Sequence, residues 1–557
     1  MEKRQFRALH RVFLLRIVSL DLLSSDGDPV RLLGQLAALL AAISMTFCLP
    51  LLVMGGYSAQ FASIMEHCLP ATTMLVTGLI AILSWDSILP DRQDVLILGP
   101  LPVEPRTIFL AKLAAIAYLI GLSVIAVNAF SGLLWPLYFG SNGEIAALAR
   151  SFAAFWITTF LAAAFMLLSV LTLQGVASQL LPRQAFLRVS ASIQTAGFCL
   201  MLGMYILEPS LESPDALSAS ENHRLLEWLP SYWFFGAFQI LNGSPGRLQP
   251  IHAALAHRAW IATGLVLLGA IATLMLSYFR TMRKLIEEPE IAASQNRWTS
   301  LLRFGGALPA AISIFSLLTL LRSRQHRVIL SFYYGAGLAI AAVYLKTLLL
   351  MQIRTPGATV VLFGQPLLAA STVMMCVAVA AVRLVSGLPI TLGANWIFQI
   401  TELRPPRAYL EAVRAALLLV GVAPIWAASG ALFFSLWPWR MAAEHMLLLA
   451  LIGAILVELC LIRFRKIPFT CSYLPGKGNM QFVFWAFGLI VLPLVDLVTK
   501  LEMKALDSSL GFAAATGVLG LMLLCVKILA SKTQTAPSIR FEENGEPLIS
   551  ALQLDRG

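Results

Sequence analysis

Long apolar runs alternate with short polar stretches along almost the whole chain. Each run holds about twenty mainly apolar residues, the length of helix that crosses the hydrocarbon of a bilayer. A membrane β-barrel would show short segments of alternating hydrophobicity instead, and none dominate here. The pattern therefore predicts an all-α, polytopic helical membrane protein with about twelve transmembrane helices. The predicted spans cover residues 32–56, 66–88, 109–137, 150–174, 190–208, 259–279, 327–352, 360–382, 409–435, 441–461, 480–499 and 511–530.

One stretch of sequence occurs twice, 300 residues apart. Residues 97–122, ILGPLPVEPRTIFLAKLAAIAYLIGL, align without a gap on residues 397–422, IFQITELRPPRAYLEAVRAALLLVGV. The identical pairs are Ile97 and Ile397, Pro105 and Pro405, Leu110 and Leu410, Ala115 and Ala415, Leu119 and Leu419, and Gly121 and Gly421. The repeat predicts two tandem six-helix bundles, over residues 32–279 and 327–530. Such repeats commonly build a transport pathway or a rocking interface between the two halves.

The segments outside the spans predict how each half begins and how the halves are joined. Residues 1–31 mix arginines with apolar residues, a pattern typical of a helix that lies in the membrane interface. We expect residues 280–326 to form a cytoplasmic linker followed by a second interfacial helix, and residues 531–557 to form a cytoplasmic C-terminal tail. The outer loop 209–258 contains an aromatic-rich stretch, 227–246, which predicts either a short helix dipping into the outer interface or a simple aromatic belt.

The chain is basic, and the placement of its charges predicts its orientation. It is 59% hydrophobic and 12% charged, with a formal net charge of +11. With both termini placed in the cytoplasm, 31 of the 40 Lys and Arg residues fall in cytoplasmic segments and only 8 in outer loops. This asymmetry follows the positive-inside rule and predicts a multi-pass protein of the cell (cytoplasmic) membrane with both termini inside. We therefore ascribe the charge to topology and to the lipid bilayer as partner, and expect no nucleic-acid partner.

Motifs of catalytic or metal-binding domains are absent from the sequence. The seven cysteines form no CxxC pair, so neither a zinc site nor a disulfide framework is indicated. The closest approach to a P-loop, LPGKGN at 474–479, lacks the preceding glycine and the following hydroxyl that cradle phosphate. HExxH, GxSxG and a Gly-rich dinucleotide loop are also missing. We expect no catalytic residues, no metal site and no cofactor bound by this chain.

Few ionisable residues are expected inside the spans, with Lys346 and Asp496 the main ones. Lys346 can extend its ammonium group towards an interface. Asp496 lies one helical turn before Lys500, which predicts a local ion pair. His67 follows Glu66 at the end of the second span and is expected to be interfacial rather than catalytic. This scarcity argues against a proton-driven transporter with a buried carboxylate relay.

A charged loop with an apolar centre joins the second and third predicted spans. Residues 84–112 read SWDSILPDRQDVLILGPLPVEPRTIFLAK. Four prolines between residues 90 and 105 break a continuous helix, so we expect a short amphipathic piece framed by turns. Its charges would be available to a soluble cytoplasmic partner. An ordinary solvated loop that carries positive-inside residues is the alternative.

Residues 91–112 of this loop resemble the cytoplasmic loop of ABC-2 type ABC transporter permeases. In that family an acidic and basic opening is followed by a Leu-rich stretch, Leu-Pro, and then Ile and Lys at the start of the third span. The family loop is the coupling helix that docks into the nucleotide-binding subunit. The resemblance implies that five residues face the ATPase: Asp91, Arg92, Asp94, Glu104 and Arg106.

The resemblance also implies a fold and a set of partners. The fold would be like that of a type V exporter, with an interfacial helix before the first span, six spans in each half and short outer helices between the fifth and sixth spans. The chain would be a transport subunit and no enzyme, because it lacks an ATPase motif of its own. A separate nucleotide-binding ATPase subunit, in two copies, would bind the ATP.

The second copy of the loop departs from the family pattern. Residues 388–414 contain no D-R-x-D, and Thr401 and Glu402 replace Leu-Pro. The second docking contact is therefore expected to be weaker or to use different residues, through Glu402, Arg404 and Arg407.

Two other classes of protein remain open alongside the ABC permease. An ion-coupled secondary transporter of the major facilitator kind also has six plus six spans, a charged central linker and a DR-containing loop after the second span. The present loop lacks the G-x-x-x-D-R-x-G-R-R form of that family, and the long outer loop lies between the fifth and sixth spans. An integral membrane enzyme acting on lipid or sugar would need clustered acids, His or Arg at an interface, and none stands out.

Overall fold

The computed structural model describes residues 2–18, 29–54, 59–85, 98, 100–140, 144–209, 211–243, 249–287, 307–354, 364–387, 406–462, 469 and 490–533. All regular secondary structure in these ranges is helical, and they contain no strand. The chain divides into two compact units, Met1–Ala293 and Ser294–Gly557. The boundary falls inside the charged segment 280–326.

Ten helices in the described ranges are long and apolar enough to cross a membrane, five in each unit. The protein is therefore a multi-pass helical membrane protein. Two of the twelve predicted spans are not among the ten. The apolar part of the fifth, Ser192–Leu207, is shorter than a full span because polar residues occupy the start of its helix. The eleventh, 480–499, is described only from residue 490.

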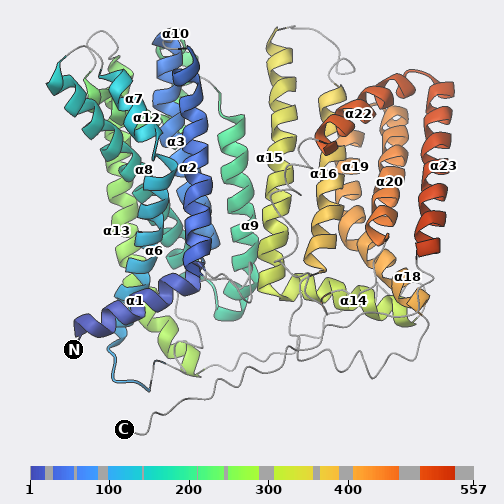
Figure 1. Ribbon diagram of the computed structural model, residues 1–557, viewed down its shortest axis with the longest axis horizontal. Coiled ribbons are helices and arrows are strands. Elements are labelled where there is room, and N and C mark those ends of the chain that lie inside the picture. Colours follow the sequence, from blue (N-terminus) through green and yellow to red (C-terminus); the bar gives the residue numbers. More distant parts are fainter. Residues whose placement is uncertain are drawn as a thin grey trace. The chain divides into compact units, whose positions relative to one another are not determined.

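The first unit has one helix lying across its end and a group of short helices near the opposite end (Figure 1). Its helices are α1 (Glu2–Val18), α2 (Pro29–Met54), α3 (Ala59–Leu83), α6 (Pro105–Val127), α7 (Ser131–Phe139), α8 (Ile145–Leu180), α9 (Arg183–Leu207), α10 (Pro214–Ser218), α11 (Ser220–Trp228), α12 (Pro230–Asn242) and α13 (Pro250–Glu287). We refer to its two ends as the α1 end and the α12 end.

The second unit also has a helix lying across one end, α14, and a short helix, α22, near the other (Figure 1). Its helices are α14 (Ala307–Arg322), α15 (Arg324–Arg354), α16 (Gly364–Val385), α18 (Pro406–Leu417), α19 (Ala423–Leu436), α20 (Trp439–Leu461), α22 (Leu492–Leu506) and α23 (Ser509–Thr533). A short π-helix, Leu418–Val422, joins α18 to α19.

The two units share an order of packing. In the first, α1 packs on α6, α8 packs on α3 and α13, and the short helix α12 fits against α3 and α13. In the second, α14 packs on α18, α20 packs on α16 and α23, and α22 fits against α16 and α23. Corresponding contacts thus join helices at the same places in the two halves, which agrees with the sequence repeat.

The repeated sequence begins a helix in both units. Proline opens α6 at Pro105 and α18 at Pro406, one residue after the aligned Pro405. Proline suits this position because the first residues of a helix have no intrahelical partner for their N–H groups. The copies differ further along, where the π-helix of the second unit takes the place of regular α-helix in α6.

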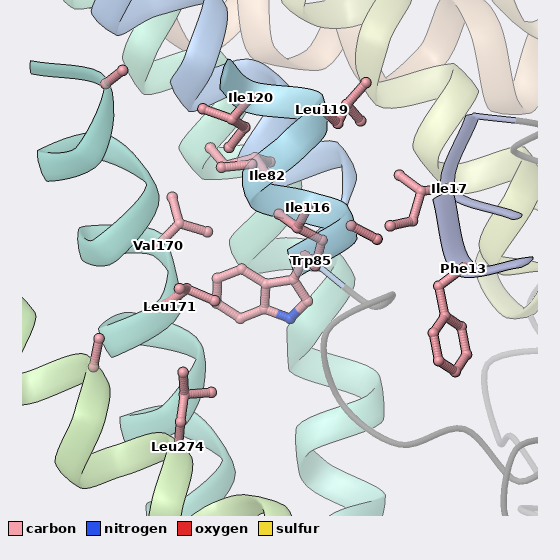
Figure 2. Packing of buried hydrophobic residues seen from close by; sticks show 14 of the residues in the cluster. Phe13, Ile17, Ile82, Trp85, Ile116, Leu119, Ile120, Val170, Leu171 and Leu274 are labelled. Atoms are coloured by element: carbon pink, nitrogen blue, oxygen red, sulfur yellow. The ribbon is translucent and has the colours of Figure 1, made fainter. Parts of the chain in front are cut away.

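The largest hydrophobic cluster of the first unit joins α1, α3, α6, α8 and α13 (Figure 2). Trp85, two residues after the end of α3, is fully buried between Ile116 of α6 and Leu171 of α8. Its backbone carbonyl accepts a hydrogen bond from the Gln174 side chain. Phe13 brings α1 into the same cluster, so α1 is part of the core at this end.

The aromatic-rich outer stretch forms a helix inside the first unit. Tyr232, Phe234 and Phe235 of α12 are buried, and α12 packs against α3, α8 and α13. The expected short helix is therefore present, and these three rings pack inside the protein. Gly236 allows the close approach, since a Cβ there would lie 2.6 Å from Leu255 Cβ and 2.9 Å from the His252 carbonyl oxygen.

Glycine and threonine alternate across the contact of α8 with α13. A Cβ on Gly175 would overlap the Thr273 side chain, and a Cβ on Gly269 would lie 2.9 Å from Thr172 Cγ2. Thr172 Oγ1 donates to the Val266 carbonyl across the contact at 3.0 Å. Small residues of this kind let helix backbones approach closely inside a membrane.

We expect Gly175→Ala to lower the free energy of unfolding by about 1–3 kcal/mol, because the added methyl group overpacks this contact. The matched control is Gly264→Ala on α13, where a Cβ would have no heavy atom within 4 Å. Chemical unfolding in detergent, followed by circular dichroism, measures both variants. Equal stability of the two would contradict the role given to Gly175.

Candidate functional site

The residues expected to face an ATPase are only partly within the described ranges. Asp91, Arg92, Asp94, Glu402 and Arg404 lie outside them. The structure places Glu104 and Arg106 at the start of α6, and both side chains are exposed. Arg407 lies in the first turn of α18.

The described part of the loop is a compact turn that precedes α6. The Leu101 N–H donates to the Leu98 carbonyl at 3.1 Å, and the Thr107 N–H donates to the Glu104 carbonyl at 2.9 Å. Leu98 and Val103 pack against the large hydrophobic cluster, whereas Leu101 is 49% exposed. Two apolar side chains thus fix the turn on the hydrophobic cluster. Leu101, Glu104 and Arg106 are exposed.

Helix α1 braces this turn through α6. Phe13 of α1 is buried in the cluster that holds Leu98 and Val103, and the ammonium of the buried Lys112 lies 5.2 Å from the centroid of its ring. A cation over an aromatic face in a site with little water is stabilising. The turn, α6 and α1 therefore form one packed body, and a push on the turn would be transmitted to both helices.

The corresponding end of the second unit holds an ion pair between a half-buried arginine and a buried glutamate. Arg414 Nε lies 2.7 Å from Glu458 Oε1, and Arg414 Nη2 donates to Glu458 Oε2 at 3.1 Å, which joins α18 to α20. The fork geometry suits a carboxylate and fixes both side chains. The backbone N–H of Phe469 donates to the Ser386 carbonyl at 2.7 Å, and its ring packs among α14 and α16 residues. In both units, polar contacts and apolar packing thus hold the core together next to the helix that lies across this end, which is α1 in the first unit and α14 in the second.

A second group of functional candidates is buried at the α12 end of the first unit. His67 Nδ1 lies 2.8 Å from Glu212 Oε1, and its Nε2 lies 3.5 Å from Glu208 Oε1. The His67 ring stacks on Tyr232, with centroids 4.1 Å apart. One residue earlier, Glu66 accepts a hydrogen bond from the Gln239 side chain. These contacts join α3 to α12 and to the segment before α10.

The second unit has a buried histidine and carboxylate near its α22 end. His445 Nδ1 of α20 lies 2.6 Å from Glu502 Oε1 of α22, and His445 Nε2 lies 3.1 Å from Ser371 Oγ of α16. All three side chains are buried, and Glu502 Oε2 has no hydrogen-bond partner among the residues that the structure describes. The order of Ser, His and Glu resembles a hydrolytic triad, but a fully buried Ser371 cannot meet a substrate in this conformation. The arrangement holds α22 in the unit.

The predicted spans contain buried ionisable residues besides Lys346 and Asp496. Glu458 and His445 both fall within the predicted span 441–461, and both are buried. Glu66 and His67 are buried as well. Each has a polar partner, which lowers the cost of burial. The partners lie far away in sequence, so the sequence offers no direct signal that joins them.

The expected pair of Asp496 with Lys500 is confirmed. Lys500 Nζ lies 2.7 Å from Asp496 Oδ2, and Gln365 of α16 donates to the same carboxylate at 2.9 Å. The first unit contains a matching bond, since Gln239 of α12 donates to Glu66 of α3. In both units an amide and a carboxylate therefore join the second long helix to the short helix near its end.

Tyr232 carries three of the polar contacts at the α12 end. Its hydroxyl donates to the Pro209 carbonyl at 2.6 Å, accepts from the Leu211 N–H at 2.9 Å and lies 3.3 Å from Glu212 Oε1. Burial, followed by the nearby carboxylates, raises the pKa of the Tyr232 phenol above its ordinary value, so the hydroxyl keeps its proton.

We expect Tyr232→Phe to lower the free energy of unfolding by about 1–3 kcal/mol, since the Leu211 N–H and the Pro209 carbonyl would lose their partner. The control is Tyr118→Phe on α6, whose side chain is 53% exposed and should change stability by less than about 0.5 kcal/mol. Thermal unfolding in detergent measures both. A Tyr232 variant as stable as the Tyr118 variant would show that this hydroxyl is dispensable.

Within the described residues, no group of three or more His, Cys, Asp or Glu is placed so that it could hold a metal ion. No family model, curated protein or solved structure matches the chain.

Proposed function

We propose that the protein is the membrane-spanning permease subunit of an ABC-2 type ATP-binding cassette transporter that works as an exporter. A separate nucleotide-binding ATPase, in two copies, would bind the ATP and supply the energy. The observation that supports the proposal most is the turn before α6, which exposes Leu101, Glu104 and Arg106 and is fixed on the core of α1 and α6. The repeat of the same packing order in the second unit adds support, because two halves can receive two ATPase subunits.

The mechanism would be mechanical. Closure of an ATPase dimer would displace the turn before α6 and the segment before α18. Since the turn, α6 and α1 share one hydrophobic cluster, the displacement would move α6 and α1 together. Rigid-body movements of packed helices are a known way to switch between inward-facing and outward-facing states.

The proposed location is the cytoplasmic membrane, with the α1 end and the α14 end on the inner side. The positive-inside distribution of Lys and Arg supports this orientation. Both termini would then be cytoplasmic, and the α12 end would face outward.

The test is co-purification of the full chain from its native membrane in a mild detergent, followed by identification of soluble chains and an ATPase assay. A P-loop ATPase in stoichiometric amount, lost when Asp91, Arg92 and Asp94 are changed to Ala, is the expected result. Purification of the chain without an ATPase, from an extract that still contains the soluble ATPases of the cell, would contradict the proposal.

An ion-coupled secondary transporter is the second candidate, and the buried titratable groups favour it. His67 with Glu212, and His445 with Glu502, place histidine and carboxylate inside the helical units. Buried ionisable groups in membrane proteins often belong to proton or ion pathways. Uptake or export that follows an imposed proton gradient in proteoliposomes, without any ATPase, would establish this class instead.

A further inference from the structure

Helix α1 has a basic face that the core does not use. Lys3, Arg4, Arg7 and Arg11 are all exposed, and we call these four residues the basic face of α1. Spacings of three and four residues place Arg4, Arg7 and Arg11 on one side of a helix. No ion pair of these cations occurs within the described ranges of the chain. The face is therefore open to a ligand of opposite charge.

The other side of α1 is fixed to the transmembrane core. Phe13 and Ile17 are buried in the large cluster, and Phe6 and Leu9 pack against it. The His10 ring meets the Tyr118 ring edge-on, with centroids 5.8 Å apart. These contacts hold the helix in one orientation, so the basic face keeps a constant direction relative to the unit.

The contacts along α6 locate α1 in depth. They fall at Lys112 and Tyr118, whereas α6 begins at Pro105. Seven residues of helix rise about 10 Å, so the start of α6 projects roughly that far beyond α1. An amphipathic helix packed across the end of a helical unit, with arginines on its exposed side, is typical of the membrane interface. Val12, which is 58% exposed beside the arginines, fits the apolar part of such an interface.

We infer that the basic face of α1 binds the headgroups of anionic phospholipids in the surrounding bilayer. The row from Arg4 to Arg11 extends about 10 Å along the helix, so it matches a row of neighbouring headgroups better than one free phosphate. Basic residues beside a transmembrane core are attracted to anionic lipid, each by a factor of about five in affinity. This inference does not depend on the proposed transport function, because lipid binding requires neither the ATPase nor a substrate.

The test is native mass spectrometry of the full chain in detergent, with phosphatidylglycerol and phosphatidylcholine added at equal concentration. We expect the chain to retain phosphatidylglycerol in preference to phosphatidylcholine. The R4Q/R7Q/R11Q variant should lose this preference, with affinity for phosphatidylglycerol lowered about a hundredfold. Added NaCl should weaken the binding, since exposed charges are screened by salt.

Two controls separate charge from folding and from other sources of phosphate. R4K/R7K/R11K keeps the charges and should keep the preference, whereas R150Q/R440Q/K504Q removes three exposed cations elsewhere and should not alter it. Equal retention of the two lipids by the natural chain, or an unchanged preference in R4Q/R7Q/R11Q, would overturn the inference. Displacement of phosphatidylglycerol by millimolar inorganic phosphate would identify a free-phosphate site and would overturn it too.

Discussion

Glu502→Ala is expected to lower the free energy of unfolding by about 3–5 kcal/mol, because it would leave His445 buried without its carboxylate partner. The two side chains are 2.6 Å apart, and both are almost completely removed from solvent. The substitution also releases α22, which packs against α16 and α23. Chemical unfolding in detergent, followed by circular dichroism, measures the change.

The hydrogen-bond pattern explains why this loss should be large. The Ser371 hydroxyl donates its one proton to the Leu368 carbonyl at 2.8 Å. His445 Nε2 lies 3.1 Å from Ser371 Oγ, and Nδ1 lies 2.6 Å from Glu502 Oε1, so both ring nitrogens have a polar partner. Removing the carboxylate would leave Nδ1 without its partner in a nearly water-free place.

Two further variants make the prediction specific to the pair. Lys500→Ala on the same helix breaks the pair with Asp496, which is largely exposed, and should cost no more than about 0.5 kcal/mol. The double variant H445A/E502A should be less destabilised than the sum of the two single variants, because neither side chain is left buried without the other. If Glu502→Ala were as mild as Lys500→Ala, the buried ion pair would not be what holds α22.

The sequence predicts the membrane class and the general plan well, and the reason is physical. A helix that crosses hydrocarbon needs about twenty apolar residues, so the spans are visible as runs. The gapless match of 97–122 with 397–422 points to two halves, and the prolines at 105 and 406 begin helices in the same context. These features depend on residues that are neighbours in the sequence, so they can be predicted without knowing which distant residues come into contact.

The polar interior could not be predicted in the same way. Phe234 and Phe235 of α12 suit either a membrane interface or a protein core, and only the packing against α8 and α13 decides between them. His67 and Glu212 are 145 residues apart, and His445 and Glu502 are 57 residues apart. A single ionisable residue in an apolar run indicates that its burial costs free energy, but it does not identify the partner that lowers this cost. Only the fold shows which residue that is.

Exchanging two charges at the start of α6, in the variant E104R/R106E, is expected to abolish binding of the proposed ATPase subunit. Both side chains are exposed, and Glu104 makes no side-chain capping bond to the helix, so the fold should tolerate the exchange. The net charge is unchanged, but each partner charge on the ATPase would meet a like charge. Such juxtapositions cost several kcal/mol, which corresponds to more than a hundredfold in affinity. Pull-down with the ATPase present in the same membrane extract measures the loss.

The matched control exchanges an ion pair at the α12 end of the same unit. Glu227 and Arg258 form a bond of 2.9 Å, and E227R/R258E keeps one positive and one negative charge at that place. This variant should bind the ATPase like the natural chain. Arg407→Glu, at the start of α18, should weaken binding less than E104R/R106E does, because the second copy lacks the D-R-x-D opening. Unchanged binding by E104R/R106E would move the docking surface away from α6 and would leave the turn of Leu101 and Glu104 as an ordinary solvated connection.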